Sequence, residues 1–383
     1  MLSRRHLLAA ATALPAARAL AASTPPLTRA FPGKAEMILQ RTTPALLETP
    51  LSAFQDIITP NDRFFVRWHW PFPTEIDPAT FRLRVDGHVT RPLDLSLAAL
   101  KRLPRFEITA VNQCSGNSRA LFSPRIAGAQ WTHGAMGNAR WTGVRLRDVL
   151  DRAGAKPGAV QVRFSGLDEP VTPDAPDFRK SLAVDHARNG EVMIAWAMNG
   201  EALPILNGFP LRLVVPGWFS TYWVKMLDHI EVLDKPDDNY WMAKAYLVPD
   251  TLDGSIAPGT KDFAKRPIST MVPRAFITNV AEGARLPLAP TPVGGIAMGG
   301  DSGVARVEVS GDGGASWAEA KLGPDAGKYS FRRFDAVVTP TRGAAALMAR
   351  CTNAAGKVQP MTGIWNPGGY LRGQVETTNV IFA

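Results

Sequence analysis

One cysteine stands in a segment whose small and polar residues suit metal chemistry. The run Ser-Gly-Asn-Ser separates Cys114 from Arg119. A single cysteine is most often a buried structural thiol. With a nearby histidine as base it could be a nucleophile, and as a thiolate it could bind a transition metal. In the last case the small neighbours would leave room for a bulky cofactor, and the segment alone leaves all three interpretations open.

The elements that would position this segment belong to a mixed domain. From residue 23 to about residue 60 the chain has the pattern of an irregular lead-in punctuated by prolines. Strand patterns then cover residues 81–85, 160–164, 211–215 and 225–232, and a helix pattern covers 145–153 with Gly154 as its C-cap. Strands mixed with short helices predict an α+β domain.

The last third of the chain has a different pattern. Residues 250–267 are rich in Pro, Gly and charge, and we interpret them as a linker. Strand patterns follow at regular spacing over 275–280, 304–310, 317–321, 329–334 and 344–351, and Gly-Asp-Gly-Gly at 311–314 predicts a hairpin turn. Such spacing predicts an immunoglobulin-like β-sandwich. We therefore divide the mature chain into a catalytic domain, 23–262, and a sandwich domain, 263–383.

Composition and cysteine content limit the function. Hydrophobic residues make up 45% and charged residues 20% of the 383 residues, which is typical of a globular protein. The net charge is +9, but basic residues alternate with acids, and no dense Lys/Arg block predicts nucleic-acid binding. The basic excess suits an anionic substrate and an acidic partner, although a solvated surface explains it as well. No Cys-x-x-Cys-His run is present to attach a c-type haem, and we expect Cys351 to be a buried structural thiol.

Residues 1–22 have the pattern of an export signal. Arg4 and Arg5 form a twin-arginine pair, followed by an Ala/Leu stretch and a small-residue exit at 19–21. The apolar run is too short to span a membrane and contains Pro15 and Arg18, and no later stretch resembles a span. Twin-arginine signals mark proteins exported already folded, so we expect a periplasmic protein. An ordinary secretory signal with a chance arginine pair is the alternative.

The segment at 114–119, together with Gly-Ala-Met-Gly-Asn-Ala-Arg-Trp-Thr-Gly-Val at 134–144, resembles the molybdenum-binding segment of the sulfite oxidase family. The resemblance runs from about Phe64 to the C-terminus and is strongest to the catalytic subunits of bacterial sulfite:cytochrome c oxidoreductases. It implies a molybdenum ion bound by Cys114 and by molybdopterin, in the form without an attached nucleotide. It also implies oxidation of sulfite to sulfate.

The resemblance implies a set of cofactor contacts. Three further segments resemble family motifs, Phe-Val-Arg-x-His at 65–69, Gly-Leu-Asp at 166–168 and Trp-Val-Lys at 223–225. In a fourth, His-Gly-Phe-Pro-x-Arg, Asn207 replaces the histidine, and an amide can form hydrogen bonds but cannot carry charge. Arg212 and Lys225 lie on or beside predicted strands, where a bound phosphate would offset the cost of a buried cation. The implied cofactor-binding residues are Phe65, Val66, Arg67, Trp68, His69, Asp168, Asn207, Arg212, Trp223, Val224 and Lys225.

The resemblance also implies a catalytic set. Small oxyanions need fixed cations, and the guanidinium fork suits their geometry. Arg67 and Arg119 match the family, while an inserted Pro-Gly-Gly-Tyr stands before the third candidate, Arg372. Tyr246 would donate a hydrogen bond to the substrate, and Trp241 has the spacing of a family tryptophan. Trp131 would form a wall of the pocket and lower its dielectric constant, although it could nearly as well be a plain core aromatic. The implied catalytic residues are Arg67, His69, Arg119, Trp131, Tyr246 and Arg372.

Partners and rival functions follow from the same comparison. Electrons would pass to a c-type cytochrome, either a tight subunit or a diffusing acceptor. The sandwich resembles the family's dimerisation domain, which allows a homodimer, although a cytochrome subunit could replace the second copy. A sulfane dehydrogenase of a thiosulfate-oxidising system is the main alternative, and activity on free sulfite separates the two. A nitrate reductase and a secreted binding module without metal or pterin are weaker alternatives.

Overall fold

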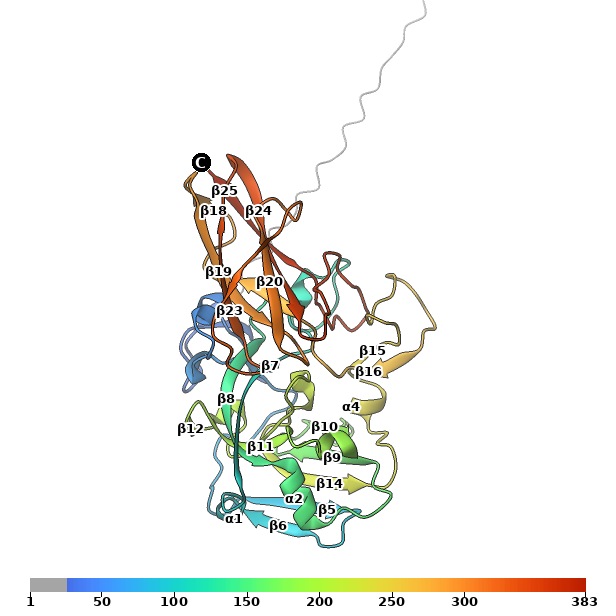
Figure 1. The fold of residues 1–383 in the computed structure, drawn as a ribbon. Helices are drawn as coiled ribbons and strands as arrows, with labels where there is room; N and C mark the ends of the chain where they lie inside the picture. The colour runs from blue at the N-terminus through green and yellow to red at the C-terminus, as the bar shows by residue number, and fades with distance from the viewer. Residues whose placement is uncertain (1–25) are drawn as a thin grey trace, which may run out of the picture.

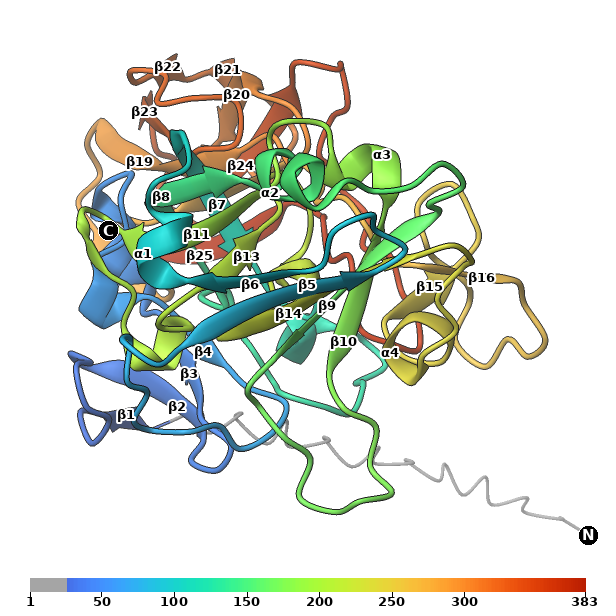
Figure 2. The ribbon, with the colours of Figure 1, turned by 90° about the horizontal axis from the view of Figure 1, so that it is seen from below.

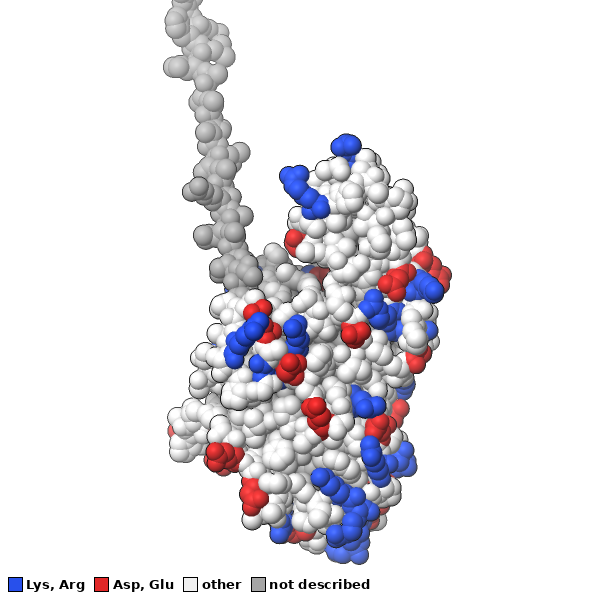
Figure 3. Space-filling view, turned by 90° about the vertical axis from the view of Figure 1, so that its left-hand side faces the viewer, with Lys and Arg blue, Asp and Glu red and all other residues white. Residues whose placement is uncertain are grey.

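The computed structural model describes residues 26–383, so the predicted signal at 1–22 lies outside the described residues. The two predicted domains occupy opposite ends of the molecule, with the sandwich uppermost in Figure 1. On the face in Figure 3, Lys and Arg side chains are interspersed with Asp and Glu. Within residues 26–383, no helix is long and apolar enough to cross a membrane.

The N-terminal region forms a small antiparallel sheet. Its strands pair in the order β1-β2-β3-β4, and Met37, Leu47 and Trp68 pack into one buried cluster beneath it. The predicted irregular lead-in is therefore wrong for 37–48, where these apolar side chains gain a common core. The elements are β1 (Leu27–Thr28), β2 (Met37–Arg41), β3 (Leu46–Glu48), β4 (Val66–Arg67) and the 3₁₀ turns η1 (Leu51–Gln55) and η2 (Asn61–Arg63).

Two five-stranded sheets build the catalytic domain. One has the order β10-β9-β14-β5-β6, with β14 and β5 parallel, and it faces the viewer in Figure 2. The other has the order β12-β11-β8-β7, with β13 paired to β11. The strands are β5 (Arg82–Gly87), β6 (Leu93–Ser96), β7 (Arg105–Gln113), β8 (Met136–Arg145), β9 (Gln161–Gly166), β10 (Arg179–Ala183), β11 (Met193–Met198), β12 (Glu201–Ala202), β13 (Arg212–Val214) and β14 (Leu227–Leu233).

Helices in this domain are short. The predicted helix at 145–153 is confirmed as α2 (Leu146–Ala153), which buries Leu146, Val149 and Leu150. It ends at Gly154, whose positive φ of 69° is a conformation that glycine adopts without strain. In this conformation the Gly154 N–H donates to carbonyls of the last helical turn. The other elements are α1 (Leu97–Leu100), α3 (Val184–Ala187), α4 (Tyr240–Ala243), η3 (Arg119–Leu121), η4 (Ile205–Asn207) and η5 (Ser220–Tyr222).

The C-terminal region is a β-sandwich. Its sheets have the orders β17-β19-β23-β22 and β18-β25-β24-β20-β21, and they enclose a core that includes Val307, Phe334 and Leu347. Cys351 is fully buried in this core, as expected of a structural thiol. The strands are β17 (Arg274–Ile277), β18 (Ala284–Leu286), β19 (Thr291–Met298), β20 (Val304–Ser310), β21 (Ala318–Glu319), β22 (Lys321–Leu322), β23 (Arg332–Val338), β24 (Gly343–Asn353) and β25 (Glu376–Phe382). The predicted α+β class, with a mixed domain followed by a sandwich, is confirmed.

Two local predictions are wrong. The proposed linker at 250–267 contains β16 (Lys265–Pro267), which pairs with β15 (Leu247–Pro249), so the chain folds back as a hairpin across the predicted 262/263 limit. The strand expected at 317–321 is divided between β21 and β22, which belong to different sheets. In both cases the strand pairing decides the structure: β15 pairs with β16, β21 with β20, and β22 with β23. The exact domain limits stay a prediction.

Candidate active site

Cys114 lies directly after β7, where the chain leaves the sheet. Its backbone N–H donates to the carbonyl of Ala135 (2.8 Å), and its carbonyl accepts from the N–H of Asn117 (2.9 Å). Ser118 then takes a left-handed conformation with φ of 66°, and η3 begins at Arg119. The strand end and this turn hold the thiol at the junction of two cavities.

The first cavity, whose space of about 490 Å³ includes open solvent, is rich in hydrogen-bond donors. Several of its side chains carry a buried polar atom that has no partner within the described chain, namely Arg67 (Nη1), His69 (Nδ1), Asn112, Ser115, Arg212 (Nε) and Thr221. Native proteins leave few such atoms unpaired, so the cavity has the lining of a binding site. Of the predicted cofactor residues, it is lined by Phe65, Arg67, His69, Asn207, Arg212, Trp223 and Lys225.

Buried positive charge dominates this cavity. Burial lowers the pKa of Lys225 to about 7, although the Asp168 carboxylate opposes the shift. Burial also lowers the pKa of Arg212 to about 9. The Arg212 guanidinium lies over the rings of Trp141 (4.9 Å) and Trp223 (5.8 Å). A bound phosphate would relieve the cost of these cations, as the sequence predicts.

Asn207 has a role that its sequence position did not suggest. Its side-chain amide donates to the Phe65 carbonyl (3.0 Å), and its Oδ1 accepts from Lys34 Nζ (2.7 Å). Lys34 also donates to the carbonyls of Asn61 and Phe64, both at 2.8 Å. Asn207 therefore lines the cavity, and its hydrogen bonds link two segments of the cavity wall. Its contact with a cofactor stays a prediction.

Four predicted cofactor residues line neither of the two cavities at Cys114. Val66 and Val224 are buried in the core. Trp68 donates to the carbonyl of Leu206 (3.0 Å), and its ring lies 4.2 Å from Lys225 Nζ. Asp168 is buried, and burial raises its pKa to about 6 against the pull of Lys225. These four residues do not line either cavity, and their contacts with a cofactor stay a prediction.

The second cavity, of about 850 Å³, shares Arg67, Cys114, Ser115 and Tyr246 with the first. Arg41, Arg119 and Trp131 are among its other lining residues, so Trp131 lies in the wall of this cavity, and its effect on the substrate stays a prediction. Within residues 26–383, no ion pair neutralises the three arginines of this wall, whose guanidinium groups find only carbonyl partners or none. The cavity is therefore suited to a small anion.

Tyr246 and His69 form one hydrogen-bonded unit between the cavities. The Tyr246 hydroxyl lies 2.5 Å from His69 Nε2. Burial lowers the pKa of His69 well below its usual value, and the nearby cations Arg67 and Lys225 add to the shift. When the Tyr246 hydroxyl donates, neutral His69 accepts the hydrogen bond at Nε2 and carries its proton on Nδ1. The ring of His69 stacks on Phe178 (3.8 Å), which fixes its plane.

The inserted Pro-Gly-Gly-Tyr at 367–370 holds Arg119. The guanidinium donates to the Gly368 carbonyl (3.0 Å) and lies 5.1 Å from the centre of the Tyr370 ring. A Cβ at Gly369, where φ is 60°, would come within 2.7 Å of Arg119 Nε. Tyr370 also stacks on Tyr246 at 5.4 Å. Sequence reasoning missed Tyr370 as a site residue, although the insertion itself was the signal.

The structure places Arg372 outside the two cavities at Cys114, and its catalytic role stays a prediction. Its guanidinium forms two 3.1 Å hydrogen bonds with Glu376 and one of 2.9 Å with the Leu121 carbonyl. It lines neither of the two cavities that meet at Cys114. Glu376, the first residue of β25, neutralises the charge of Arg372. Arg41 provides the third guanidinium instead.

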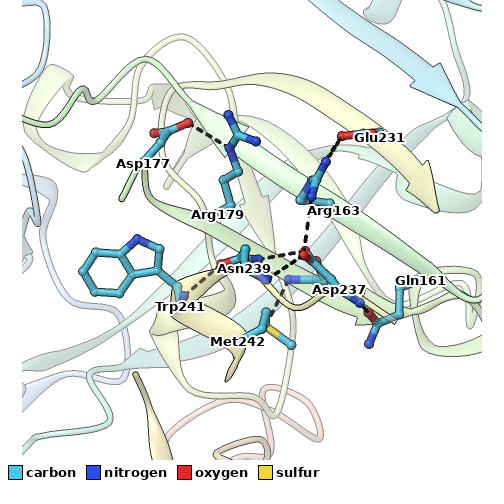
Figure 4. A network of polar contacts seen from close by, with 10 residues as sticks. Gln161, Arg163, Asp177, Arg179, Glu231, Asp237, Asn239, Trp241 and Met242 are labelled. Carbon is cyan, nitrogen blue, oxygen red and sulfur yellow. Dashed lines mark hydrogen bonds and ion pairs between the residues drawn. The ribbon is translucent and has the colours of Figure 1, made fainter. Parts of the chain in front are cut away.

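A polar network behind the site anchors α4 and Trp241 (Figure 4). Asp237 accepts from Arg163 (3.4 Å), from Ser181 and from Asn239 Nδ2 (2.8 Å). Asn239 then caps the helix by accepting from the Trp241 N–H (2.8 Å). The Trp241 ring lies 4.8 Å from His69, so this network fixes the packing around the His69–Tyr246 pair.

Comparisons with known proteins agree with this geometry. The family model described as oxidoreductase molybdopterin binding domain matches residues 69–241, and the Mo-co oxidoreductase dimerisation domain matches 265–377. The chain is 30% identical to Arabidopsis thaliana sulfite oxidase over 86% of this chain and 89% of that protein. It is 35% identical to Gallus gallus sulfite oxidase over 82% of this chain and 71% of that protein. The chain belongs to the sulfite oxidase family of molybdenum enzymes.

Other relatives add detail to this assignment. The chain spans about half the length of the mammalian mitochondrial sulfite oxidases that it matches, for example 49% of the Mus musculus protein. The crystal structure of the sulfane dehydrogenase from Paracoccus pantotrophus superposes with a TM-score of 0.77 at 27% identity, covering 90% of this chain and 86% of that chain. The fold of the chain is therefore similar to that of this sulfane dehydrogenase over nearly its whole described length.

The residues present fit the molybdenum–molybdopterin cofactor of the family. The buried donors and cations of the first cavity suit a polar, phosphate-bearing pterin. At its junction with the second cavity stands one thiol, Cys114, as a soft ligand for the metal. No cluster of three or more His, Cys, Asp and Glu side chains occurs in the described part of the chain. Cys114 would be the ligand that the protein supplies to the metal. The first cavity would hold the cofactor, which would leave the second for substrate.

Proposed function

We propose that this protein is a periplasmic sulfite dehydrogenase that oxidises sulfite to sulfate and passes the electrons to a c-type cytochrome. The observation that carries the proposal is the second cavity, where Arg41, Arg67 and Arg119 surround Cys114 without carboxylate partners among the described residues. Such a cavity favours a small, doubly charged oxyanion. The identity to sulfite oxidases supports the choice of sulfite.

Each side chain of the site has its own role in the proposed reaction. Arg67 and Arg119 bind and orient the oxyanion, and their fixed positions stabilise the charge that develops as the product forms. Tyr246 donates one hydrogen bond to the substrate or to His69 Nε2, while Trp131 excludes water. When bound, the molybdenum centre supplies oxygen-atom transfer and accepts the two electrons of the reaction.

A sulfane dehydrogenase is the second candidate. The likeness to the sulfane dehydrogenase of Paracoccus pantotrophus over 90% of the chain favours it. The cavity at Arg119 is also open to solvent, so a sulfur group carried on another protein would have a route into it. Free sulfite distinguishes the two candidates because only a sulfite dehydrogenase turns it over rapidly.

Metal analysis with a sulfite assay tests the proposal. We expect about one molybdenum per chain, because the site has one cysteine ligand, and rapid sulfite-dependent reduction of ferricyanide and cytochrome c. Cys114→Ser should reduce turnover to background while the protein remains folded. Cys351→Ala, a change of the other buried cysteine, should retain turnover. Molybdenum without sulfite activity would favour the sulfane dehydrogenase, and normal activity in Cys114→Ser would refute the ligand assignment.

Export and partners form part of the proposal. The twin-arginine pair at Arg4 and Arg5 supports folded export to the periplasm. Replacing both arginines by lysine should retain the protein in the cytoplasm, measured by cell fractionation. The match to a dimerisation domain at 265–377 supports a homodimer, which light scattering of the purified protein would detect. Co-purification of a haem protein would instead indicate a heterodimer.

A further inference from the structure

Arg41 reaches the substrate cavity because of an irregularity in β2. Leu39 is paired with Leu47, but Arg41 is paired with Leu46, so Gln40 is an extra residue in the strand. Neighbouring residues of β3 point to opposite faces, and the bulge therefore turns Arg41 to the face opposite Leu39. Leu39 packs with the cluster around Leu47, whereas Arg41 lines the second cavity.

The same ladder brings Arg41 and Arg67 to one face. Leu46 of β3 is directly opposite Arg41 on one side and opposite Arg67 of β4 on the other. Residues directly opposite one another share a face, so the two arginines flank Leu46 with their backbones about 10 Å apart, or two strand spacings. All three residues line the second cavity.

The positive charge on this face has no carboxylate partner among the described residues, which favours binding of an anion. The only hydrogen bond of the Arg41 guanidinium is from Nε to the Pro44 carbonyl (3.3 Å), and within residues 26–383 no Asp or Glu forms an ion pair with it. Partial burial and the charge of Arg67 both lower the pKa of Arg41. Like charges held on one face without a carboxylate are unfavourable unless an anion binds between them.

Arg41 stands before the part of the chain that the molybdopterin-domain model matches, 69–241. We propose that Arg41 is a specificity-determining residue that binds the incoming oxyanion at the mouth of the cavity and passes it to Arg67 and Arg119. This role rests on the proposed oxidation of a sulfur oxyanion. Arg41 is exposed at the cavity rim, so it acts on capture of the anion more than on the chemical step.

Kinetics of the holoenzyme test this role. Arg41→Met should raise the sulfite KM about 10-fold, the lower end of electrostatic steering effects, and leave kcat with ferricyanide within about twofold. The defect should shrink at high ionic strength, because salt screens exposed charges. Arg41→Lys should restore most of the affinity. Arg29→Met removes an exposed cation that is paired with Glu36 in the segment between β1 and β2, and it should behave as wild type.

Sulfate binding provides a measurement that does not depend on turnover. In calorimetric titrations of the holoenzyme with sulfate, Arg41→Met should weaken binding about as much as it raises the sulfite KM, again about 10-fold. Unchanged sulfate binding and sulfite KM, or an equal loss in Arg29→Met, would overturn the proposal. A higher KM for cytochrome c alone would also overturn it and would make Arg41 a docking charge. If the wild type binds sulfate through Arg41 but does not oxidise sulfite, the proposed function fails while the anion-binding role stands.

Discussion

Arg274 Nη2 lies 3.0 Å from Ser118 Oγ, which joins the sandwich to the loop between Cys114 and Arg119. The same nitrogen lies 2.7 Å from Glu376 Oε1, and the Arg274 side chain is fully buried. His133 Nδ1 also lies 2.9 Å from Ser118 Oγ. The sandwich domain therefore contributes directly to the position of the active-site loop.

Arg274→Met should weaken both the fold and the site. It leaves Glu376 with one fewer cation in a buried network, and breaking a buried pair costs about 3–5 kcal/mol of unfolding free energy. We also expect a lower kcat, because the loop that carries Arg119 loses its anchor. Denaturant unfolding and steady-state kinetics measure the two effects.

Arg350→Met is the matched control for this change. Arg350 pairs with Glu308 at 2.9 Å within the sandwich, where both side chains are partly exposed. Its loss should cost about 1 kcal/mol, as for surface pairs, and leave kcat unchanged. An equal fall of kcat in both variants would mean that the sandwich acts through overall stability and not through Ser118.

Sequence reasoning located the parts of the site that local motifs define. Cys114, Arg67, Arg119, His69 and Tyr246 meet at the two cavities as predicted. Each stands in a short segment whose residues are typical of the family, so the type of site could be predicted. The α2 helix was predictable for the same reason, because its apolar spacing and Gly154 are local signals.

The remaining site residues depend on contacts that local patterns do not contain. Simple strand alternation from Leu39 would place Arg41 on the wrong face, because the bulge at Gln40 has no clear sequence signal. Lys34 and Asn207 are 173 residues apart in the chain yet form a hydrogen bond. Arg372 is of the residue type expected for anion binding, but its guanidinium pairs with Glu376 and does not line either cavity.

Tyr246→Phe should lower kcat without unfolding the protein. The change removes the hydroxyl that lies 2.5 Å from His69 Nε2 and faces both cavities. Loss of one well-placed donor typically costs about 10²-fold in rate. Tyr222→Phe, which removes a buried hydroxyl bound to the Ile268 carbonyl (2.6 Å), should retain kcat and lose about 1 kcal/mol of stability. Sulfite kinetics of the two variants settle the comparison, and a normal kcat in Tyr246→Phe would remove Tyr246 from the reaction.

Asp237→Ala should disturb the site from behind. It removes the acceptor shared by Arg163, Ser181 and Asn239 (Figure 4), and leaving these donors unpaired costs about 1–3 kcal/mol. Because Asn239 caps α4, we expect a changed near-ultraviolet circular dichroism signal from Trp241 and a lower kcat/KM for sulfite. The neighbouring exposed Asp238 provides the control Asp238→Ala, which should change neither. Indistinguishable variants would show that the network does not fix Trp241.

Lys34→Met should alter how stability depends on pH. Burial lowers the pKa of Lys34 to about 7, whereas a lysine in the unfolded chain titrates near about 10.4. Between about pH 7 and 10 the unfolded chain therefore binds a proton that the folded chain has lost, so the unfolding free energy rises with pH. Lys34→Met lacks this contribution, and its profile should be flatter by up to about 1.4 kcal/mol per pH unit in that window. Urea unfolding across the window measures the difference, with Lys101→Met, an exposed lysine, expected to parallel the wild type. Parallel profiles for all three proteins would show that the carbonyls of Asn61 and Phe64 keep the Lys34 ammonium charged in the folded state.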